Sequence, residues 1–230
     1  MNRLSPELVV FDLAGTTIRD GGEVPEAFVE ALKVSGMAID AAEVLALRGA
    51  SKREAIGRLV ARHRPALEPA AREELARSTY EQFRRDLTRR LRAAHDLEMP
   101  GARSVFERLR RAGIRVAVNT GFDRAVVDAT FEVVGWPRTL FDAVVCGDDV
   151  SEGRPSPLMI QRAMAITGVS HPRRVAVVGD TRLDREAGAN AGAAYRIGVL
   201  TGAHDRATLE AAPFTHVLAS IVDLPVLWGA

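Results

Sequence analysis

The chain of 230 residues is long enough for one large domain, or for one domain carrying a smaller inserted one, and for a well-buried core. Its formal charge of +1, from 31 Lys and Arg against 30 Asp and Glu, leaves no basic field to attract nucleic acid, so we expect a small-molecule partner. The single cysteine, Cys146, excludes an internal disulfide, and the lack of a long apolar run predicts a cytoplasmic protein without a membrane partner.

The first predicted strand ends in a carboxylate. Residues 8–12 read LVVFD, an apolar β-branched run, and small residues and two hydroxyls follow Asp12. Small residues let backbone N–H groups turn toward an anion beside the carboxylate. A strand-end Asp can equally cap the next turn, so Asp12 taken alone does not decide between the two interpretations.

Residues 21–97 interrupt the pattern of strands. They contain no convincing strand and are typical of several helices, rich in Ala, Leu, Arg and Glu. Gly and Pro in RDGGEVP and HDLEMPGA mark a candidate hinge at each end. We therefore predict a helical domain, residues 21–97, inserted into a core domain of residues 1–20 and 98–230. Its arginines alternate with acidic and apolar residues, which favours a solvated helix face over an anion-binding patch.

The rest of the chain alternates strands with helices. Helical patterns separate three further β-branched runs, at residues 114–120, 141–149 and 173–180. This alternation predicts an α/β fold with a doubly wound parallel sheet, covered by helices on both faces. Ligands of such sheets bind beyond the carboxyl ends of the strands. We therefore expect one crevice lined by four strand-end side chains: Asp12, Thr120, Asp148 and Asp180.

Carboxylates at this crevice predict a metal site. Asp180 ends a predicted strand and Asp184 follows one helical turn later, at the i, i+4 spacing that places two carboxylates on one side. With Asp12 they would repel one another unless a cation lay between them, and oxygen-only ligands favour Mg²⁺. The alternative is that Asp184 is an ordinary exposed helix residue.

Further groups suit phosphoryl transfer. Thr120 contributes a hydroxyl, and Gly121 lets the backbone approach a ligand closely. Arg154 is a fixed cation before a helix that Pro155 is expected to help start. In isolation Thr120 and Arg154 can each be an ordinary strand-end or surface residue. Together with magnesium and backbone amides they are the parts needed for transfer through an aspartyl-phosphate on Asp12.

Four motifs of this chain resemble those of the haloacid dehalogenase superfamily: FDLAGTT, VNTG, the Arg154 of EGRPSP, and GDTRLD. The resemblance spans essentially the whole chain and implies that residues 21–97 correspond to the helical cap of that superfamily. It implies a nucleophilic Asp12 and a Mg²⁺ site made of Asp12, the backbone carbonyl of Ala14, Asp180 and Asp184.

Ala14 stands where most phosphatases of the superfamily carry a second Asp that protonates the leaving group. An alkoxide would depart poorly without that acid, so Ala14 argues against an ordinary phosphate ester. DLAGTT and the third-motif arginine are similar to the branch of phosphonoacetaldehyde hydrolases, or phosphonatases. A carbon–phosphorus bond has no leaving oxygen to protonate, and a lysine iminium supplies the electron sink that its cleavage needs.

The resemblance implies that this lysine is Lys52, three residues after Gly49 in LRGASKREAIGRL. A helix N-terminus and enclosure between cap and core both favour its free amine. The same stretch also resembles the specificity loop of capped phosphatases, where a basic residue only contacts substrate or solvent. Ala55 and Phe122 replace a histidine and a tyrosine of phosphonatase, which points to the phosphonatase-like group and to a substituted 2-oxoalkylphosphonate.

We therefore predict a Mg²⁺-dependent hydrolase that cleaves the carbon–phosphorus bond of a small 2-oxoalkylphosphonate through a Schiff base and an aspartyl-phosphate. We assign catalysis to Asp12, Lys52, Thr120 and Arg154. We assign substrate binding to Gly15, Thr16, Gly49 and Gly121. Arg48, Ala50 and Ser51 are expected to line the cap side of the site. The alternatives are a phosphatase for a small phosphate monoester and a non-catalytic phosphate-binding or interaction protein. The resemblance also implies a homodimer formed through the cap.

Overall fold

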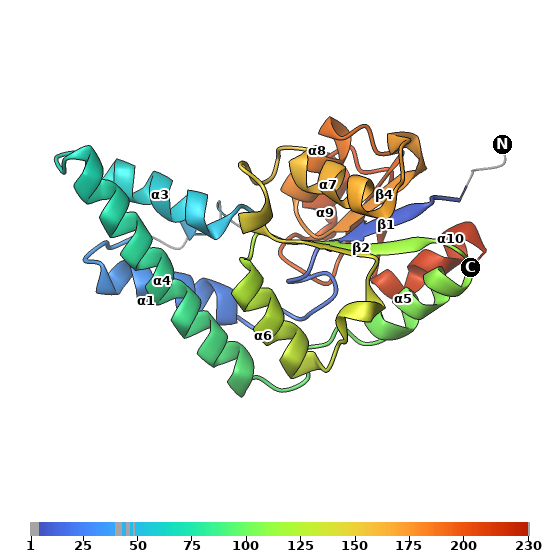
Figure 1. Ribbon diagram of the computed structural model, residues 1–230, viewed down its shortest axis with the longest axis horizontal. Coiled ribbons are helices and arrows are strands. Elements are labelled where there is room, and N and C mark those ends of the chain that lie inside the picture. Colours follow the sequence, from blue (N-terminus) through green and yellow to red (C-terminus); the bar gives the residue numbers. More distant parts are fainter. Residues whose placement is uncertain (1–4, 40–42, 45–46, 48, 230) are drawn as a thin grey trace.

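The computed structural model describes residues 5–39, 43–44, 47 and 49–229, and its centre is a six-stranded parallel sheet (Figure 1). The strand order is β3-β2-β1-β4-β5-β6, which confirms the predicted doubly wound α/β fold. The strands are β1 Leu8–Phe11, β2 Arg115–Asn119, β3 Ala143–Val145, β4 Val175–Gly179, β5 Tyr195–Val199 and β6 His216–Leu218.

The apolar residues of β1 alternate between two separate parts of the core. Val9 and Phe11 pack on one face of the sheet, in a cluster with Phe106 and Leu109. Leu8 and Val10 pack on the other face with residues such as Ile160 and Ala187. Successive side chains of a strand point to opposite faces, so a strand buried on both faces must be apolar throughout.

Helices cover both faces and follow the strands along the chain. The sheet-covering helices are α5 Ala102–Arg111, α6 Arg124–Val134, α7 Leu158–Thr167, α8 Arg182–Asn190, α9 Arg206–Ala211 and α10 Leu224–Trp228. Single turns of 3₁₀ helix occur at Arg138–Leu140, Gly147–Asp149, Pro172–Arg174 and Ile221–Asp223. None of the helices in the described part of the chain is long and apolar enough to cross a membrane.

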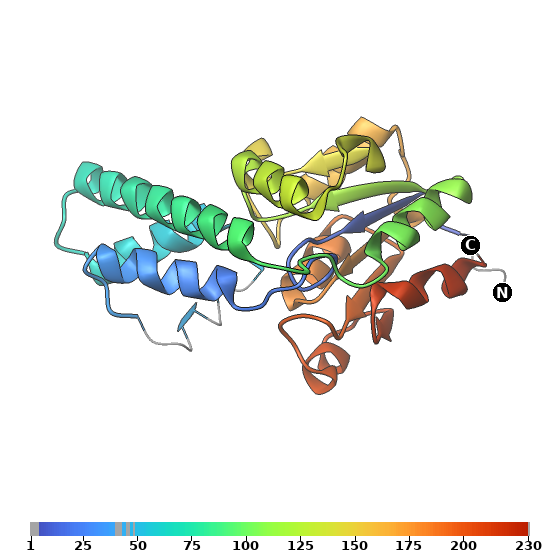
Figure 2. The same cartoon turned by 90° about the horizontal axis from the view of Figure 1, so that it is seen from below.

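Three further helices pack against one another at one end of the molecule, beyond the carboxyl end of β1 (Figures 1 and 2). These cap helices are α1 Glu23–Val34, α3 Lys52–His63 and α4 Pro69–Ala93. Their facing sides are apolar, as in the edge-to-face contact of Phe28 on α1 with Phe83 on α4, whose ring centroids lie 5.8 Å apart. The long helix α4 also packs against α6, which follows β2.

The chain enters and leaves the cap helices through two segments that lie side by side. The backbone N–H of Arg19 donates to the carbonyl of Leu97 at 2.7 Å, and that of Met99 donates to Thr17 at 2.9 Å. The two connections between the cap helices and the sheet are therefore hydrogen-bonded to each other. The nucleophile candidate Asp12 lies a few residues before the first of them.

Candidate active site

Asp12 follows the last residue of the central strand β1. Its backbone N–H donates to the carbonyl of Val178 on β4 at 2.9 Å, so the neighbouring strand fixes the start of the loop. Only 6% of Asp12 is exposed. The loop then turns sharply at Gly15, whose φ of +86° favours glycine, and a Cβ there would lie 2.7 Å from Oδ2 of Asp180. The first motif is therefore packed directly against the fourth.

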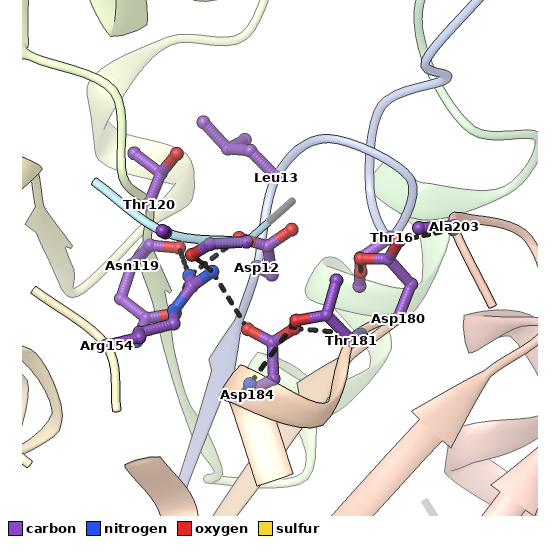
Figure 3. Close-up of polar contacts among 12 residues, drawn as sticks. Asp12, Leu13, Thr16, Asn119, Thr120, Arg154, Asp180, Thr181, Asp184 and Ala203 are labelled. Carbon is purple, nitrogen blue, oxygen red and sulfur yellow. Dashed lines mark hydrogen bonds and ion pairs between the residues drawn. The ribbon is translucent and has the colours of Figure 1, made fainter. Parts of the chain in front are cut away.

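Arg154 connects the first motif with two others (Figure 3). Its Nη2 donates to Oδ1 of Asp12 at 2.6 Å and to the backbone carbonyl of Asn119 at 2.8 Å. Its Nη1 lies 2.9 Å from Oδ1 of Asp184. All three charged side chains are almost completely buried. The guanidinium therefore holds two carboxylates from opposite sides of the site at fixed positions.

The fourth motif lies at the other side of Asp12 (Figure 3). Asp180 accepts hydrogen bonds from the hydroxyl of Thr16 at 3.3 Å and from the backbone N–H of Ala203 at 2.6 Å. Asp180 follows β4 directly and precedes α8. Asp184 is the third residue of α8, and its Oδ2 accepts from both the backbone N–H and the hydroxyl of Thr181, at 3.0 and 2.6 Å. Asp180 and Asp184 approach each other because the capping box of Thr181 and Asp184 turns the chain at the start of α8.

The charges of this cluster are strongly perturbed. Burial raises the pKa of Asp12 well above its usual range; Arg154 lowers it, and the Asp184 and Asp180 carboxylates raise it further. Burial and the neighbouring Asp184 also raise the pKa of Asp180. Although burial opposes the charge of Arg154, Asp184 and Asp12 hold its pKa above the ordinary value. The site thus carries more carboxylate charge than its one buried arginine neutralises.

The second motif borders the same cavity. Thr120 follows β2, is 3% exposed, and its hydroxyl accepts from the backbone N–H of Phe122 at 3.2 Å. A Cβ on Gly121 would lie 2.9 Å from the carbonyl oxygen of Ala50, in the loop before α3. Glycine at this position therefore allows a loop of the cap to approach the second motif closely.

Lys52 is the first residue of α3, and the side chain of Ser51 caps that helix by accepting from the backbone N–H of Glu54. The Lys52 amine donates to the carbonyls of Leu47 and Ala50 at 3.4 and 3.3 Å. It also lies 6.0 Å from the centroid of the Phe28 ring. The amine is thus held at the opening between the cap helices and the sheet.

One cavity contains most of the predicted site residues. The polar groups that line it are Asp12, Asp20, Lys52, Thr120, Arg154, Asp180 and Thr181. The remaining lining residues are small or apolar: Ala14, Val24, Pro25, Phe28, Val44, Leu47, Gly49, Ala50, Gly121 and Phe122. Gly15 and Thr16 lie beside it against Asp180. Arg48 lies outside the described residues.

Two expectations about the sheet edge are wrong. Asp148 is exposed and accepts from the backbone N–H of Arg124 at the start of α6, so it serves that helix and not the cavity. Pro155 does not start a helix, because α7 begins at Leu158 after Pro157. A polar residue that follows an apolar run can cap a helix as readily as it can line a crevice, and the sequence does not separate the two.

The oxygen atoms at this site fit a hard divalent cation. Asp12 and Asp180 are buried carboxylates whose pKa values are raised, which is the condition that a bound cation relieves. Ala14 lines the same cavity. Asp184 is already engaged by Arg154 and Thr181, and no group of three Asp, Glu, His or Cys side chains in the described part of the chain forms a ligand set. Asp12 and Asp180, which line the cavity beside Ala14, are therefore candidate ligands of such a cation.

Comparisons with known proteins agree with this geometry. The family model of the haloacid dehalogenase-like hydrolases matches residues 6–192. The phosphonoacetaldehyde hydrolase of Bacillus cereus is 32% identical over 211 residues, which cover 89% of this chain and 79% of that protein. The corresponding protein of Paraburkholderia phytofirmans is 31% identical over 199 residues, covering 83% and 73%.

A solved structure shows the same architecture. A phosphonoacetaldehyde hydrolase-like protein from Oleispira antarctica superimposes with a TM-score of 0.81 at 25% identity, over 100% of this chain and 93% of that one. Sequence and structure therefore agree over the cap helices as well as the sheet. The chain belongs to the haloacid dehalogenase-like hydrolases and is a hydrolase of that family related to phosphonoacetaldehyde hydrolases.

Proposed function

We propose that the protein hydrolyses the carbon–phosphorus bond of a small 2-oxoalkylphosphonate, using a Schiff base on Lys52 and an aspartyl-phosphate on Asp12. One observation carries this proposal: the Lys52 amine and the Asp12 carboxylate line the same cavity. Ala14, two residues after Asp12, lines that cavity without an acidic side chain. The amine would react with the carbonyl carbon of such a substrate, and the carboxylate would react with its phosphorus. The relatives named phosphonoacetaldehyde hydrolase support the assignment.

The first step uses Lys52. Its amine attacks the substrate carbonyl, and loss of water gives an iminium that can accept an electron pair from the adjacent carbon. An arginine cannot do this chemistry because its guanidinium stays protonated. The chain contains two lysines, Lys33 and Lys52, among 31 basic residues, and Lys33 is exposed on α1. Lys52 is therefore the one described amine at the cavity that can form the imine.

The second step uses Asp12. A carboxylate oxygen forms a bond to phosphorus as the carbon–phosphorus bond breaks, and the electron pair of that bond moves into the iminium to give an enamine. Protonation and hydrolysis of the enamine release the aldehyde or ketone and return the Lys52 amine. Water then hydrolyses the aspartyl-phosphate to phosphate. No oxygen leaves from phosphorus in the bond-breaking step, so a side-chain acid at Ala14 is not needed.

The charge of the transferring phosphoryl group needs donors around Asp12. Arg154 supplies the buried cation, while the Thr120 hydroxyl and the backbone amide of Gly121 supply neutral donors. The expected donors at Gly15 and Thr16 do not serve here, because their backbone N–H groups donate to the carbonyls of Ile18 and Leu13 at 2.8 and 3.1 Å. We propose Asp12, Asp180 and the Ala14 carbonyl as ligands of Mg²⁺, with Asp184 holding Arg154 beside them. When bound, Mg²⁺ would neutralise negative charge on the phosphoryl oxygens.

The carbon end of the substrate faces a less polar wall. Val24, Pro25, Phe28 and Leu47 line the cavity on the side of the cap helices. This wall excludes water from the iminium and provides apolar contact for a methyl or methylene group. It supports a short, uncharged carbon chain on the phosphonate.

Reductive trapping tests the proposal. We expect borohydride, added with Mg²⁺ and phosphonoacetaldehyde, to fix a two-carbon adduct on Lys52 and not on Lys33, with release of phosphate. Lys52→Ala should lose both the adduct and phosphate release. If no adduct forms while a phosphate monoester is hydrolysed at the same rate by Lys52→Ala, the protein is a phosphatase and this proposal fails.

A further inference from the structure

Glu54 connects the start of α3, where Lys52 lies, with the loop that carries Arg154. It lies two residues after Lys52 in the first turn of α3, and its Oε1 accepts a hydrogen bond from the backbone N–H of Gly153 at 2.7 Å. Gly153 immediately precedes Arg154. About a third of the Glu54 side chain is exposed, so it lies at the rim of the contact between cap and core.

The two segments also approach each other at the backbone. A Cβ on Gly153 would lie 2.9 Å from Cβ of Ser51, and one on Gly49, where φ is +80°, would lie 2.6 Å from the hydroxyl of Thr181. Such distances leave no room for a side chain. The segment 49–54 therefore lies directly on the core loops. The bond from Gly153 to Glu54 is the shorter of two polar links to the Arg154 loop, the other being from Nη1 of Arg154 to the carbonyl of Gly49 at 3.5 Å.

The link matters because the two ends of the proposed substrate are held by different parts of the chain. Lys52 belongs to the cap helices, whereas Arg154 is fixed in the core by Asp12 and Asn119. The distance between the amine and the phosphoryl site must match a carbon–carbon–phosphorus unit. Small displacements of a reacting group cost large factors in rate.

We propose that Glu54 is a positioning residue that holds the start of α3, and with it Lys52, in a fixed position relative to the Arg154 loop when the cap is closed on the core. This inference rests on the proposed function, because it assigns Glu54 to the alignment of the imine with the phosphoryl group. Glu54 itself touches neither reacting group. A carboxylate that accepts from a backbone N–H forms a stronger hydrogen bond than a neutral acceptor does.

The test compares three variants in steady-state hydrolysis of phosphonoacetaldehyde. Glu54→Ala should lower kcat/KM about ten-fold, the size expected from the loss of one charge-assisted hydrogen bond. Glu54→Gln keeps an acceptor oxygen and should recover most of the activity. Arg58→Ala is the matched control, because Arg58 is exposed and lies 3.8 Å from the other Glu54 oxygen, and it should match the wild type.

A second measurement separates positioning from a general loss of structure. Borohydride trapping of plain acetaldehyde on Lys52 requires the amine but no phosphoryl group, so Glu54→Ala should trap it as fast as the wild type, with an unchanged melting temperature. The proposal is overturned if Glu54→Ala hydrolyses phosphonoacetaldehyde like the wild type, or if Glu54→Gln loses as much as Glu54→Ala. A wild-type enzyme that cleaves no phosphonate overturns the proposed function as well.

Discussion

Lys52 and Lys33 offer a comparison within one small chain. Because the cavity contains only the first of them, Lys33→Ala should leave hydrolysis of phosphonoacetaldehyde unchanged. Lys52→Arg keeps a positive charge at the cavity but cannot form an imine, so the rate should fall on the order of 10³-fold or more. Steady-state phosphate release measures both variants. Retention of activity in Lys52→Arg would show that only the charge is used.

Arg154 is a residue whose loss should cost much stability. Arg154→Met leaves Asp12 and Asp184 buried without their cation, and we expect the free energy of unfolding to fall by about 3–5 kcal/mol. Urea unfolding in metal-free buffer measures the change. Arg174→Met is the control, because its ion pair with Glu7 is partly exposed and should contribute about 0–1 kcal/mol. Equal losses in the two variants would contradict the structural assignment.

The motif residues could be predicted from the sequence because each ends a strand in a recognisable local pattern. Asp12, Thr120 and Asp180 belong to this group, and the structure brings them to one cavity. Asn119 and Glu54 could not be found in this way. Asn119 acts through its backbone carbonyl as well as its side chain, and Glu54 meets a partner 99 residues away. Contacts of that kind depend on how two loops pack and leave no periodic signal.

At the scale of elements, helix α4 is tied to the second motif. The hydroxyl of Tyr80 on α4 donates to Oδ2 of Asp123 at 2.9 Å, and Asp123 caps α6 by accepting from the backbone N–H of Val126. The guanidinium of Arg53 lies 5.1 Å from the centroid of the Tyr80 ring. A buried side chain of the cap therefore holds the helix that follows Thr120 and Gly121.

Tyr80→Phe removes this hydrogen bond while keeping the ring under Arg53. We expect a loss of about 1–3 kcal/mol in the free energy of unfolding, because the carboxylate of Asp123 stays buried with one donor fewer. Thermal and urea unfolding measure the effect. Ser78→Ala is the control, since Ser78 is exposed and bonds only to its own helix, and it should change little. An unchanged Tyr80→Phe protein would show that the bond adds no stability.

The elements themselves were largely predictable, and their ends were not. The β-branched runs gave the parallel strands β1 to β4, because strands buried on both faces need continuous apolar residues. Helix α7 begins at Leu158, three residues after Pro155, which we expected to help start this helix. Helix ends depend on caps that several neighbouring residues can provide, so the pattern leaves them undetermined.

For the whole molecule, the clustered carboxylates predict how stability changes with pH. Burial raises the pKa of Asp12 and Asp180 above the unfolded value of about 4, so the folded protein binds more protons than the unfolded chain. The metal-free protein should therefore lose stability as the pH rises from about 5 to about 8. Mg²⁺ should raise the melting temperature, and more strongly at the higher pH, where it no longer competes with protons.

Scanning calorimetry at the two pH values, with and without Mg²⁺, measures this linkage. Potassium chloride at matched ionic strength controls for general screening. Asp180→Asn should weaken the stabilisation by Mg²⁺, because it removes a carboxylate that we assign to the cation. A metal-free protein that becomes more stable between pH 5 and 8 would contradict the raised pKa values.

The central place of β1 in the sheet has a consequence for the synthesis of the chain. This strand is synthesised before the other strands of the sheet, yet its neighbours are β2, which begins at Arg115, and β4, which begins at Val175. Both edges of β1 stay unpaired until those strands have been made, and unpaired strand edges invite association with other chains. Arg154, which Asp12 contacts across 142 positions, also arrives late. In a nascent chain Asp12 therefore lacks its pocket until the segment that carries Arg154 has been translated, and any chain that stops before Asp184 lacks part of the site.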